Sequence, residues 1–201
     1  MPPKETPKRA ALRERLLNIA EKEVSEGGIV ALRARDLATE AGCAVGAIYT
    51  VFGDLGDIAV AVNRRTMDQI TDTMTKAVAG LDREPPEDVL ISLAQAYVDY
   101  AQNEGPRWRT LFAVGLPQSD DMPGFFDALD PISALFASPM EKIHPAHTPR
   151  KLDRNARTLF AAIHGLVVLG QEPRISAIEK SDLNRAVSAL VSATVDSGSH
   201  L

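Results

Sequence analysis

The sequence predicts an all-α protein, and three observations support that prediction. Apolar residues recur at spacings of three and four along most of the chain. β-Branched and aromatic residues are not gathered into alternating runs bounded by hairpin turns. Glycine and proline stand between the periodic stretches, as they do where helices begin and end. We expect a small N-terminal domain over residues 1–54 and a larger helical domain over residues 55–201.

Caps and breakers place the individual helices. Gly27-Gly28 suits a helix end, Gly42 separates two short helices, and Asp54 is a plausible N-cap. Thr148 is a cap followed by a proline at the first helical position, and Ser181 is expected to cap the final helix. Residues 81–87 are the expected linker, and Pro86 lies either in this linker or at the start of the next helix. Residues 115–124 are expected to form a loop. Pro131 and Pro139 should break or kink the helix that contains them. The expected helices cover roughly residues 7–26, 33–41, 44–51, 54–80, 87–104, 106–112, 125–143, 149–170 and 182–194.

Composition and charge narrow the class of protein. The chain has 201 residues, of which 45% are hydrophobic and 24% charged, as in an ordinary globular protein. A net charge of −5 argues against a protein that coats nucleic acid nonspecifically. The first 20 residues nevertheless carry five cations against two carboxylates, which suits an arm lying along phosphates. These cations are Lys4, Lys8, Arg9, Arg13 and Arg15.

The sequence also indicates the cellular compartment of the protein. The polar N-terminus lacks the apolar centre of a signal peptide, and the longest near-apolar run, residues 159–170, is interrupted by His164. The single cysteine, Cys43, fits a reducing compartment; it is either a small buried turn residue or a redox-sensing thiol. We therefore expect a cytoplasmic protein with no membrane partner.

Residues 33–52, RARDLATEAGCAVGAIYTVF, have the spacing of a helix-turn-helix. Leu37 and Ile48 occupy inward positions of the two helices, Ala38 permits close approach, and Gly42 can take a left-handed turn conformation. Spacing alone does not separate a DNA reader from an αα-hairpin in an unrelated helical protein.

The wider pattern is more specific. Five features follow one another in a fixed order: the first helix, Gly27-Gly28, RDLATEAG, GAIY and Phe52. This order resembles the N-terminal DNA-binding domain of TetR/AcrR regulators. The resemblance implies that residues 44–50 enter the major groove of operator DNA, that Gly46 lets the backbone approach, and that Tyr49 bonds a phosphate. The implied DNA-binding residues are Lys8, Arg9, Arg33, Arg35, Ala44, Val45, Gly46, Tyr49 and Thr50. The alternatives are a half-buried aromatic for Tyr49 and a solvated helix face for Arg33 and Arg35.

Three residues depart from the usual signature of that family. Ala44 stands where serine is usual, Val51 where histidine or tyrosine precedes the phenylalanine, and Leu55 where lysine opens the fourth helix. Each change removes a potential phosphate contact. We expect a weaker operator affinity and a salt dependence flatter by about 0.9 in log-log slope for each phosphate that is not neutralised.

The C-terminal half resembles the WHG module of some TetR-type regulators, over residues 85–170. Two segments show the likeness, PRWRTLF at 106–112 and LFAAIHGLVVLG at 159–170. The usual Trp-x-x-x-His-Gly appears as Phe160, His164 and Gly165, with phenylalanine in place of tryptophan. The resemblance implies a small-molecule effector, largely apolar. His164 either bonds this ligand or is a satisfied core histidine. The candidate pocket residues are Tyr97, Trp108, Phe112, Phe125, Phe126, Phe160 and His164.

A homodimer is expected because one recognition helix reads few base pairs, so specificity requires two of them about 34 Å apart. The family resemblance places the interface on the last two helices. Residues 161–168 offer a small-residue face there. The expected interface residues are Ala161, Ala162, Gly165, Val168, Leu183, Val187, Leu190 and Thr194, although an intrachain core explains some of them equally well.

Two rival functions are less consistent with these residues. An enzyme is disfavoured because no phosphate loop or nucleophile motif occurs, and the pair His144 and His147 lacks a carboxylate cluster, so we expect no metal and no cofactor. An adaptor that kept the fold but no longer binds an operator is the second rival, and the three departures favour it. The preferred expectation is a transcriptional regulator, typically a repressor, released from its operator by the effector.

Overall fold

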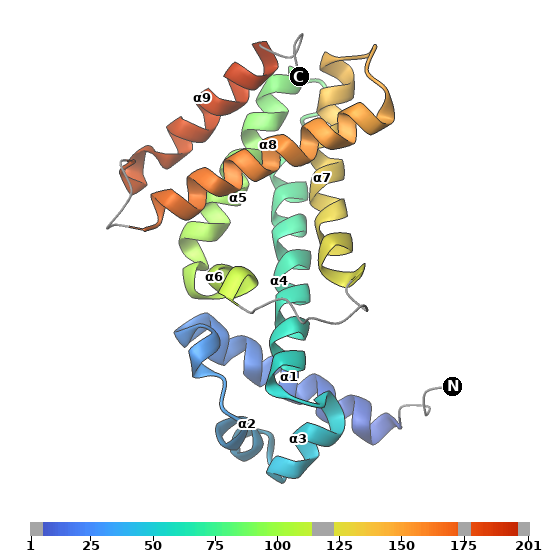
Figure 1. Cartoon of the computed structure of the whole chain (residues 1–201), viewed down its shortest axis with the longest axis vertical. Helices are drawn as coiled ribbons and strands as arrows, with labels where there is room; N and C mark the ends of the chain where they lie inside the picture. Colours follow the sequence, from blue (N-terminus) through green and yellow to red (C-terminus); the bar gives the residue numbers. More distant parts are fainter. Residues whose placement is uncertain (1–5, 114–122, 173–177, 197–201) are drawn as a thin grey trace. The chain divides into compact units, whose positions relative to one another are not determined.

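The computed structural model describes residues 6–113, 123–172 and 178–196. Within these ranges the chain forms α-helices, two 3-10 turns and no strand, which confirms the all-α prediction (Figure 1). The 3-10 turns lie at Ile29–Ala31 and Lys180–Asp182. The helices are α1 (Pro7–Gly27), α2 (Ala34–Ala41), α3 (Val45–Phe52), α4 (Leu55–Ala77), α5 (Pro86–Asn103), α6 (Gly105–Ala113), α7 (Pro123–Ile143), α8 (Pro149–Gly170) and α9 (Leu183–Asp196).

The helices gather into two compact units. Unit 1 combines Met1–Met67 with Glu104–Asp120, and unit 2 combines Asp68–Asn103 with Asp121–Leu201. Helix α4 therefore contributes its first part to unit 1 and its last turns to unit 2, while α6 belongs to unit 1. The boundary between these compact units does not fall at residue 54, and the functional division there stays a prediction.

Unit 1 is built on α1, whose ends are set locally. The Thr6 hydroxyl accepts the amide of Arg9 and Pro7 opens the helix, while Gly28 ends it at φ 70°. The inward face of α1 is fully buried with residues from α2, α3 and α4. Each such side chain contributes about 1.5–3 kcal/mol on burial. The core includes Leu16, Ala20, Leu37, Ile48, Ile58 and Val62.

The link between α2 and α3 has the geometry predicted for a helix-turn-helix. Gly42 adopts the left-handed conformation, φ 62° and ψ 42°, which favours glycine. The Cys43 amide donates to the Ala38 carbonyl at 2.9 Å and that of Gly42 to Thr39 at 3.2 Å, a Schellman arrangement that satisfies the last carbonyls of α2. The turn is therefore fixed by backbone bonds.

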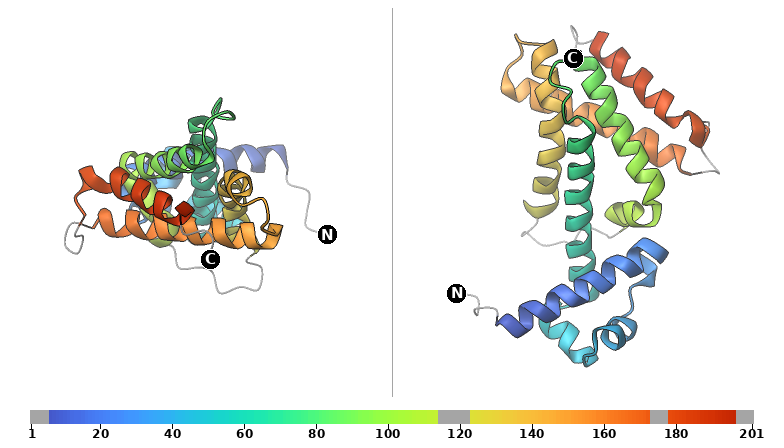
Figure 2. Two further views of the ribbon diagram at one scale, coloured as in Figure 1. Left: turned by 90° about the horizontal axis from the view of Figure 1, so that it is seen from above. Right: turned by 180° about the vertical axis from the view of Figure 1, so that it is seen from behind.

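Unit 2 packs α9 along α5 and α8, and α7 against α5 and α8 (Figure 2). Its fully buried residues include Leu90, Ile132, Phe136, Ile163, Val167 and Val191. Gly170 ends α8, and a Cβ there would lie 2.9 Å from a methyl group of Leu183. A glycine at this point thus permits the close contact between the end of α8 and the start of α9.

Two local expectations in unit 2 are wrong. Pro131 and Pro139 do not break their helix: both lie inside α7, where buried Ile132 and Phe136 hold the inward face despite the two missing amide donors. Ser181 lies in a 3-10 turn, and α9 begins at Leu183. Of the predicted loop at 115–124, residues 123 and 124 belong to α7, and the others lie outside the described residues.

No single helix of the described chain has both the length and the hydropathy of a membrane span. Helices α3 and α4 pass that test only as a pair, bent by 61° at the break between them. Their apolar residues Ile48, Phe52, Ile58 and Val62 are buried in unit 1, which accounts for the hydropathy of the pair.

Candidate functional site

Helix α3 presents a continuous exposed face. Ile48 and Phe52 are buried at 0% and 4% exposure and anchor the helix in unit 1. The opposite face carries no large charged group, and its residues are Ala44, Val45, Gly46, Tyr49 and Thr50, all exposed. An ideal Cβ on Gly46 meets no atom within 4 Å. The structure thus brings five of the predicted DNA-binding residues together on one accessible surface.

Tyr49 and the two arginines at the start of α2 are solvent-facing. The side chain of Tyr49 is 48% exposed. Arg33 is the N-cap residue of α2, Arg35 lies in its first turn, and both are exposed. All three side chains are therefore accessible to a ligand that approaches the outer faces of α2 and α3.

The basic N-terminal segment is helical from Pro7 onward. Lys8 and Arg9 consequently lie in the first turn of α1 and both are exposed. The Arg9 guanidinium donates to the Thr50 carbonyl at 2.7 Å. Arg13, one turn further along, lies over the Phe52 ring, 4.7 Å from its centroid. Two of the predicted arm cations therefore contact the C-terminal end of α3.

The three departures from the family signature have visible structural counterparts. Ala44 is the N-cap of α3, and no side chain accepts a hydrogen bond there. Val51 and Leu55 are partly buried and pack against the apolar core of unit 1. Apolar packing thus occupies two positions where the family usually places polar side chains.

A charged cluster that the sequence did not suggest joins α1, α4 and α6. The Glu21 carboxylate accepts a hydrogen bond from Arg65 at 2.5 Å and another from Arg107. Arg107 is 7% exposed and its Nε also donates to the hydroxyl of the fully buried Thr66, at 2.9 Å. Glu14 accepts a second bond from Arg65 at 2.5 Å. We call these residues, Glu14, Glu21, Arg65, Thr66 and Arg107, the Glu21 cluster.

In unit 2 the structure pairs two of the predicted ligand residues. The Tyr97 hydroxyl lies 2.8 Å from Nδ1 of His164, with the donor set by the histidine tautomer. Phe160 packs edge-on against Tyr97 at a centroid distance of 5.1 Å. Tyr97 is 1% exposed, and burial lowers the pKa of His164. His164 is therefore half-buried and hydrogen-bonded to Tyr97 within the chain.

The remaining predicted ligand residues are distributed differently. Trp108 is 2% exposed and lies on α6 in unit 1, whereas Tyr97, Phe160 and His164 belong to unit 2. The predictions for the side chains of Phe112, Phe125 and Phe126 lie outside the described residues. The described part of the predicted group thus reduces to three neighbouring residues on α5 and α8.

The predicted dimer residues fall into two sets. Leu183 and Val187 are 0% exposed within the chain, so the prediction that they face a second subunit is wrong; they are core. The exposed set lies mainly on α8, where a Cβ on Gly165 would meet nothing within 4 Å and Val168 is 41% exposed. The accessible or partly accessible residues are Ala161, Ala162, Gly165, Val168, Leu190 and Thr194.

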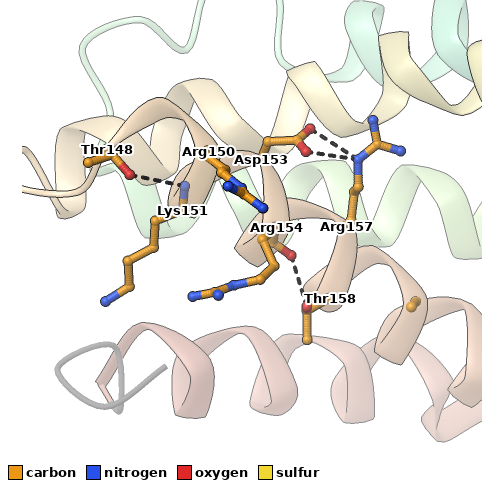
Figure 3. Close-up of a pocket in the computed structure, with 8 residues that line it drawn as sticks. Thr148, Arg150, Lys151, Asp153, Arg154, Arg157 and Thr158 are labelled. Atoms are coloured by element: carbon orange, nitrogen blue, oxygen red, sulfur yellow. Dashed lines mark hydrogen bonds and ion pairs between the residues drawn. The ribbon is translucent and has the colours of Figure 1, made fainter.

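The first turns of α8 line a basic surface groove of about 820 Å³ (Figure 3). Arg157 bonds both Asp153 and Asp130, while Arg150, Lys151 and Arg154 have no carboxylate partner among the described residues. Positive charge at the N-terminal end of a helix opposes the helix dipole. The sequence does not predict this groove, because its cations are scattered among carboxylate, amide and apolar residues of one helix and form no motif.

His144 and His147 stack at a centroid distance of 4.8 Å. Desolvation, with Lys151 and His144 nearby, lowers the pKa of His147. Among the described residues no group of three His, Cys, Asp or Glu side chains has the arrangement of a metal site.

Comparison with solved structures shows the same fold at low sequence identity. A protein of unknown function from Rhodococcus sp. RHA1 is 20% identical, with a TM-score of 0.69 over 96% of this chain and 98% of that one. The TetR family transcriptional regulator PfmR from Thermus thermophilus is 17% identical, with a TM-score of 0.59 over 88% and 96%. A tetR-family regulator from Streptomyces coelicolor is 16% identical, with a TM-score of 0.65 over 94% and 83%.

The family itself is established from the sequence. No curated protein sequence matches the chain. The family model for the tetracyclin repressor-like C-terminal domain matches residues 90–194, which is more than half of the chain. That region overlaps residues 85–170, for which the sequence resembles the WHG module. The chain therefore belongs to the TetR family of transcriptional regulators.

Proposed function

We propose that this regulator binds operator DNA sequence-specifically and acts as a repressor that a small-molecule effector releases. The observation that carries the proposal is the exposed face of α3, held by buried Ile48 and Phe52 and, apart from Tyr49, made of small side chains that leave room for a groove. An α-helix fits the major groove of B-DNA, and Gly46 leaves room for its backbone to come close.

The proposed DNA contacts are of two kinds, to phosphates and to base edges. Phosphates are contacted by Tyr49, Lys8, Arg33 and Arg35. The exposure of all four side chains supports this assignment, and the two arginines also reach base edges from the start of α2. Base contacts come from the α3 face, where small residues dominate, so apolar contact with thymine methyl groups is its main direct readout. The proposed DNA-binding residues are Lys8, Arg9, Arg33, Arg35, Ala44, Val45, Gly46, Tyr49 and Thr50.

The proposal includes a homodimer, because two recognition helices about 34 Å apart supply the specificity that one cannot. The small residues Ala161, Ala162 and Gly165 of α8, with exposed Val168, support this interface, since they are at least partly accessible and permit close helix contact. A protein that binds operator DNA works in the compartment that holds the DNA, which in a bacterial cell is the cytoplasm.

The effector site is proposed in unit 2, around Tyr97, Phe160 and His164. Aromatic rings beside one polar pair suit a largely apolar molecule with a single hydrogen-bonding group. The effector must bind the DNA-incompetent state more tightly, by about 1–3 kcal/mol for a typical coupling. Helix α4 contributes to both units, which supports it as the element that transmits the change.

The second candidate function is a TetR-like ligand-binding or adaptor protein without operator binding. Val51 and Leu55 favour it, because they pack into the core where the family usually offers polar side chains to DNA. Ala44 likewise has no side-chain group to give to a phosphate.

A mobility-shift assay separates the two candidates. Purified protein is titrated onto DNA from upstream of its own gene and onto an unrelated fragment, at low and moderate salt. We expect a specific, salt-sensitive shift that Tyr49→Phe and Arg33→Gln weaken. Arg64→Gln is the matched control, since Arg64 is exposed on α4 away from the α3 face and its replacement removes the same charge. Equal binding of both fragments would favour the adaptor.

Effector release is tested separately. A thermal-shift screen of small apolar compounds identifies a ligand, whose affinity is then measured with and without bound operator DNA. We expect tighter binding to the free protein and a loss of affinity in Tyr97→Phe and His164→Gln. Equal affinity in the two states would rule out ligand-controlled release.

A further inference from the structure

Helix α3 is a short element with little means of fixing its own ends. It has eight residues, and isolated helices of that length are unstable in water. Its N-cap, Ala44, offers no side-chain acceptor, and no basic residue of its own lies in its last turn. The Thr50 hydroxyl bonds the Gly46 carbonyl within the helix and so gives no tie to the rest of unit 1. At its C-terminal end the amides of Gly53 and Asp54 donate to the carbonyls of Tyr49 and Phe52, which leaves the Thr50 carbonyl for a donor from another element.

Helix α1 stabilises this end of α3 through two arginines. Arg9 and Arg13 are spaced by four residues, which places them on one side of α1. Arg9 donates to the Thr50 carbonyl at 2.7 Å, and Arg13 lies 4.7 Å from the centre of the Phe52 ring. Both charges stand at the end of α3 where the helix dipole is negative, so each is favourable.

From this geometry we infer that Arg9 and Arg13 are positioning residues for the recognition helix, which set the orientation of α3 rather than bind phosphate themselves. The inference rests on the proposed DNA-binding function and refines it. It reassigns Arg9, whose place in the sequence suggested a phosphate contact. The Thr6 cap is part of the device, because its hydroxyl accepts the amide of Arg9 and fixes the first turn of α1.

Lys8 provides a matched control. It adjoins Arg9 and is exposed, and its side chain makes no hydrogen bond or ion pair with the described residues. Lys8→Gln and Arg9→Gln therefore remove the same charge from neighbouring positions, and long-range electrostatic effects on DNA binding should be alike. Only Arg9→Gln also removes the tie to the Thr50 carbonyl.

The first measurement uses the DNA-free full-length protein. Amide hydrogen exchange is followed across α3 in the wild type, in Lys8→Gln, Arg9→Gln, Arg13→Gln and Arg9→Lys, and in the double variant of Arg9→Gln with Arg13→Gln. We expect about threefold faster exchange of the last-turn amides for each arginine variant and about tenfold for the pair together. Lys8→Gln should leave these rates unchanged, and Arg9→Lys should restore part of the protection. Unchanged α3 exchange in both arginine variants would overturn the inference.

The second measurement uses operator DNA at several salt concentrations. We expect Arg9→Gln to weaken specific binding severalfold more than nonspecific binding and to keep the salt slope of the wild type, whereas Lys8→Gln, which removes a proposed phosphate contact, lowers the slope by about 0.9. If Arg9→Gln instead lowers the slope as Lys8→Gln does and weakens both kinds of DNA equally, Arg9 binds a phosphate and the positioning role is wrong. If the wild type prefers no DNA, the proposed function fails, while the exchange data still decide the role of the arginines.

Discussion

The two units share an apolar core and differ in how deeply their polar ties are buried. Unit 1 adds the Glu21 cluster, whose Arg107 is buried, and the two arginines that contact α3. Unit 2 packs α5, α7, α8 and α9 together, and its described ties between helices, such as Asn184 to Asp99 and Tyr97 to His164, are exposed or part-buried. Directional ties fix angles between elements, whereas apolar packing tolerates small shifts. The contrast suits a unit that must present one helix accurately and another that must adapt to a ligand.

The largest expected effect tests the apolar side of this contrast. Phe136→Ala in unit 2 removes a fully buried ring and should lower the free energy of unfolding by about 3–5 kcal/mol. Val168→Ala is the control, because that side chain is 41% exposed and should change stability by less than about 0.5 kcal/mol. Urea denaturation measures both. A small loss for Phe136→Ala would mean that unit 2 is not stabilised mainly by its core.

The next effect tests the polar side. Glu21→Gln leaves the buried guanidinium of Arg107 without a carboxylate and should cost about 2–4 kcal/mol. The exposed pair of Lys22 and Glu40, 3.6 Å apart, is the matched control, and Glu40→Gln should cost less than about 1 kcal/mol. Equal losses in the two variants would show that the Glu21 cluster is no more than a surface ion pair. Denaturation at low and high salt gives a second test, since salt should weaken the contribution of the exposed pair but not that of the buried Arg107 and Glu21.

A third effect concerns pH and isolates His164. Its pKa is lowered in the folded state, so the unfolded chain binds the proton more readily. The corresponding stability is present above about pH 6.5 and is lost as the pH falls below that value toward the lowered pKa. We expect the melting temperature of the wild type to fall more steeply between pH 7 and pH 5 than that of His164→Gln. His147→Gln is the comparison: the pKa of His147 is lowered as well, so this variant should flatten the profile independently of His164.

The smallest expected effect concerns the start of α3 in unit 1, where no side chain caps the helix. Ala44→Ser gives α3 an N-cap and should stabilise the protein by about 0.5–1 kcal/mol. The same hydroxyl offers a phosphate a hydrogen bond but no charge, so operator affinity should rise while the salt slope of binding stays unchanged. Ala47→Ser, inside α3, is the control and should not stabilise. A destabilised Ala44→Ser would show that the start of α3 is not limited by its cap.

Local patterns explain what the sequence could predict. The turn at Gly42, the buried positions Leu37 and Ile48, and the Asp54 cap, which accepts the Asp57 amide at 2.8 Å, all depend on residues within one or two turns of each other. The exposed face of α3 follows from the same short-range periodicity. A family signature and a helical period therefore suffice for this part of the candidate site.

Long-range polar pairing explains what the sequence could not predict. Arg107 and Glu21 are separated by 86 residues, and Tyr97 and His164 by 67, so no local spacing indicates either contact. Periodicity also cannot say which apolar surface a helix meets. Leu183 and Val187 have the pattern of an interface, and they bury it inside their own subunit. Pro131 and Pro139 show the same limit, since packing overrides the local preference to end a helix.

The length of α3 limits how much information the protein can take from DNA. Eight residues span about 12 Å, or between three and four base pairs of the major groove. Two copies would read about seven base pairs, a pattern that recurs by chance about once in 10⁴ positions. A genome offers at least about 10⁶ competing sites, so on the order of a hundred would match by chance. The remaining discrimination must come from sequence-dependent DNA shape and from contacts outside α3, where the spacing of the two half-sites counts as much as their sequence.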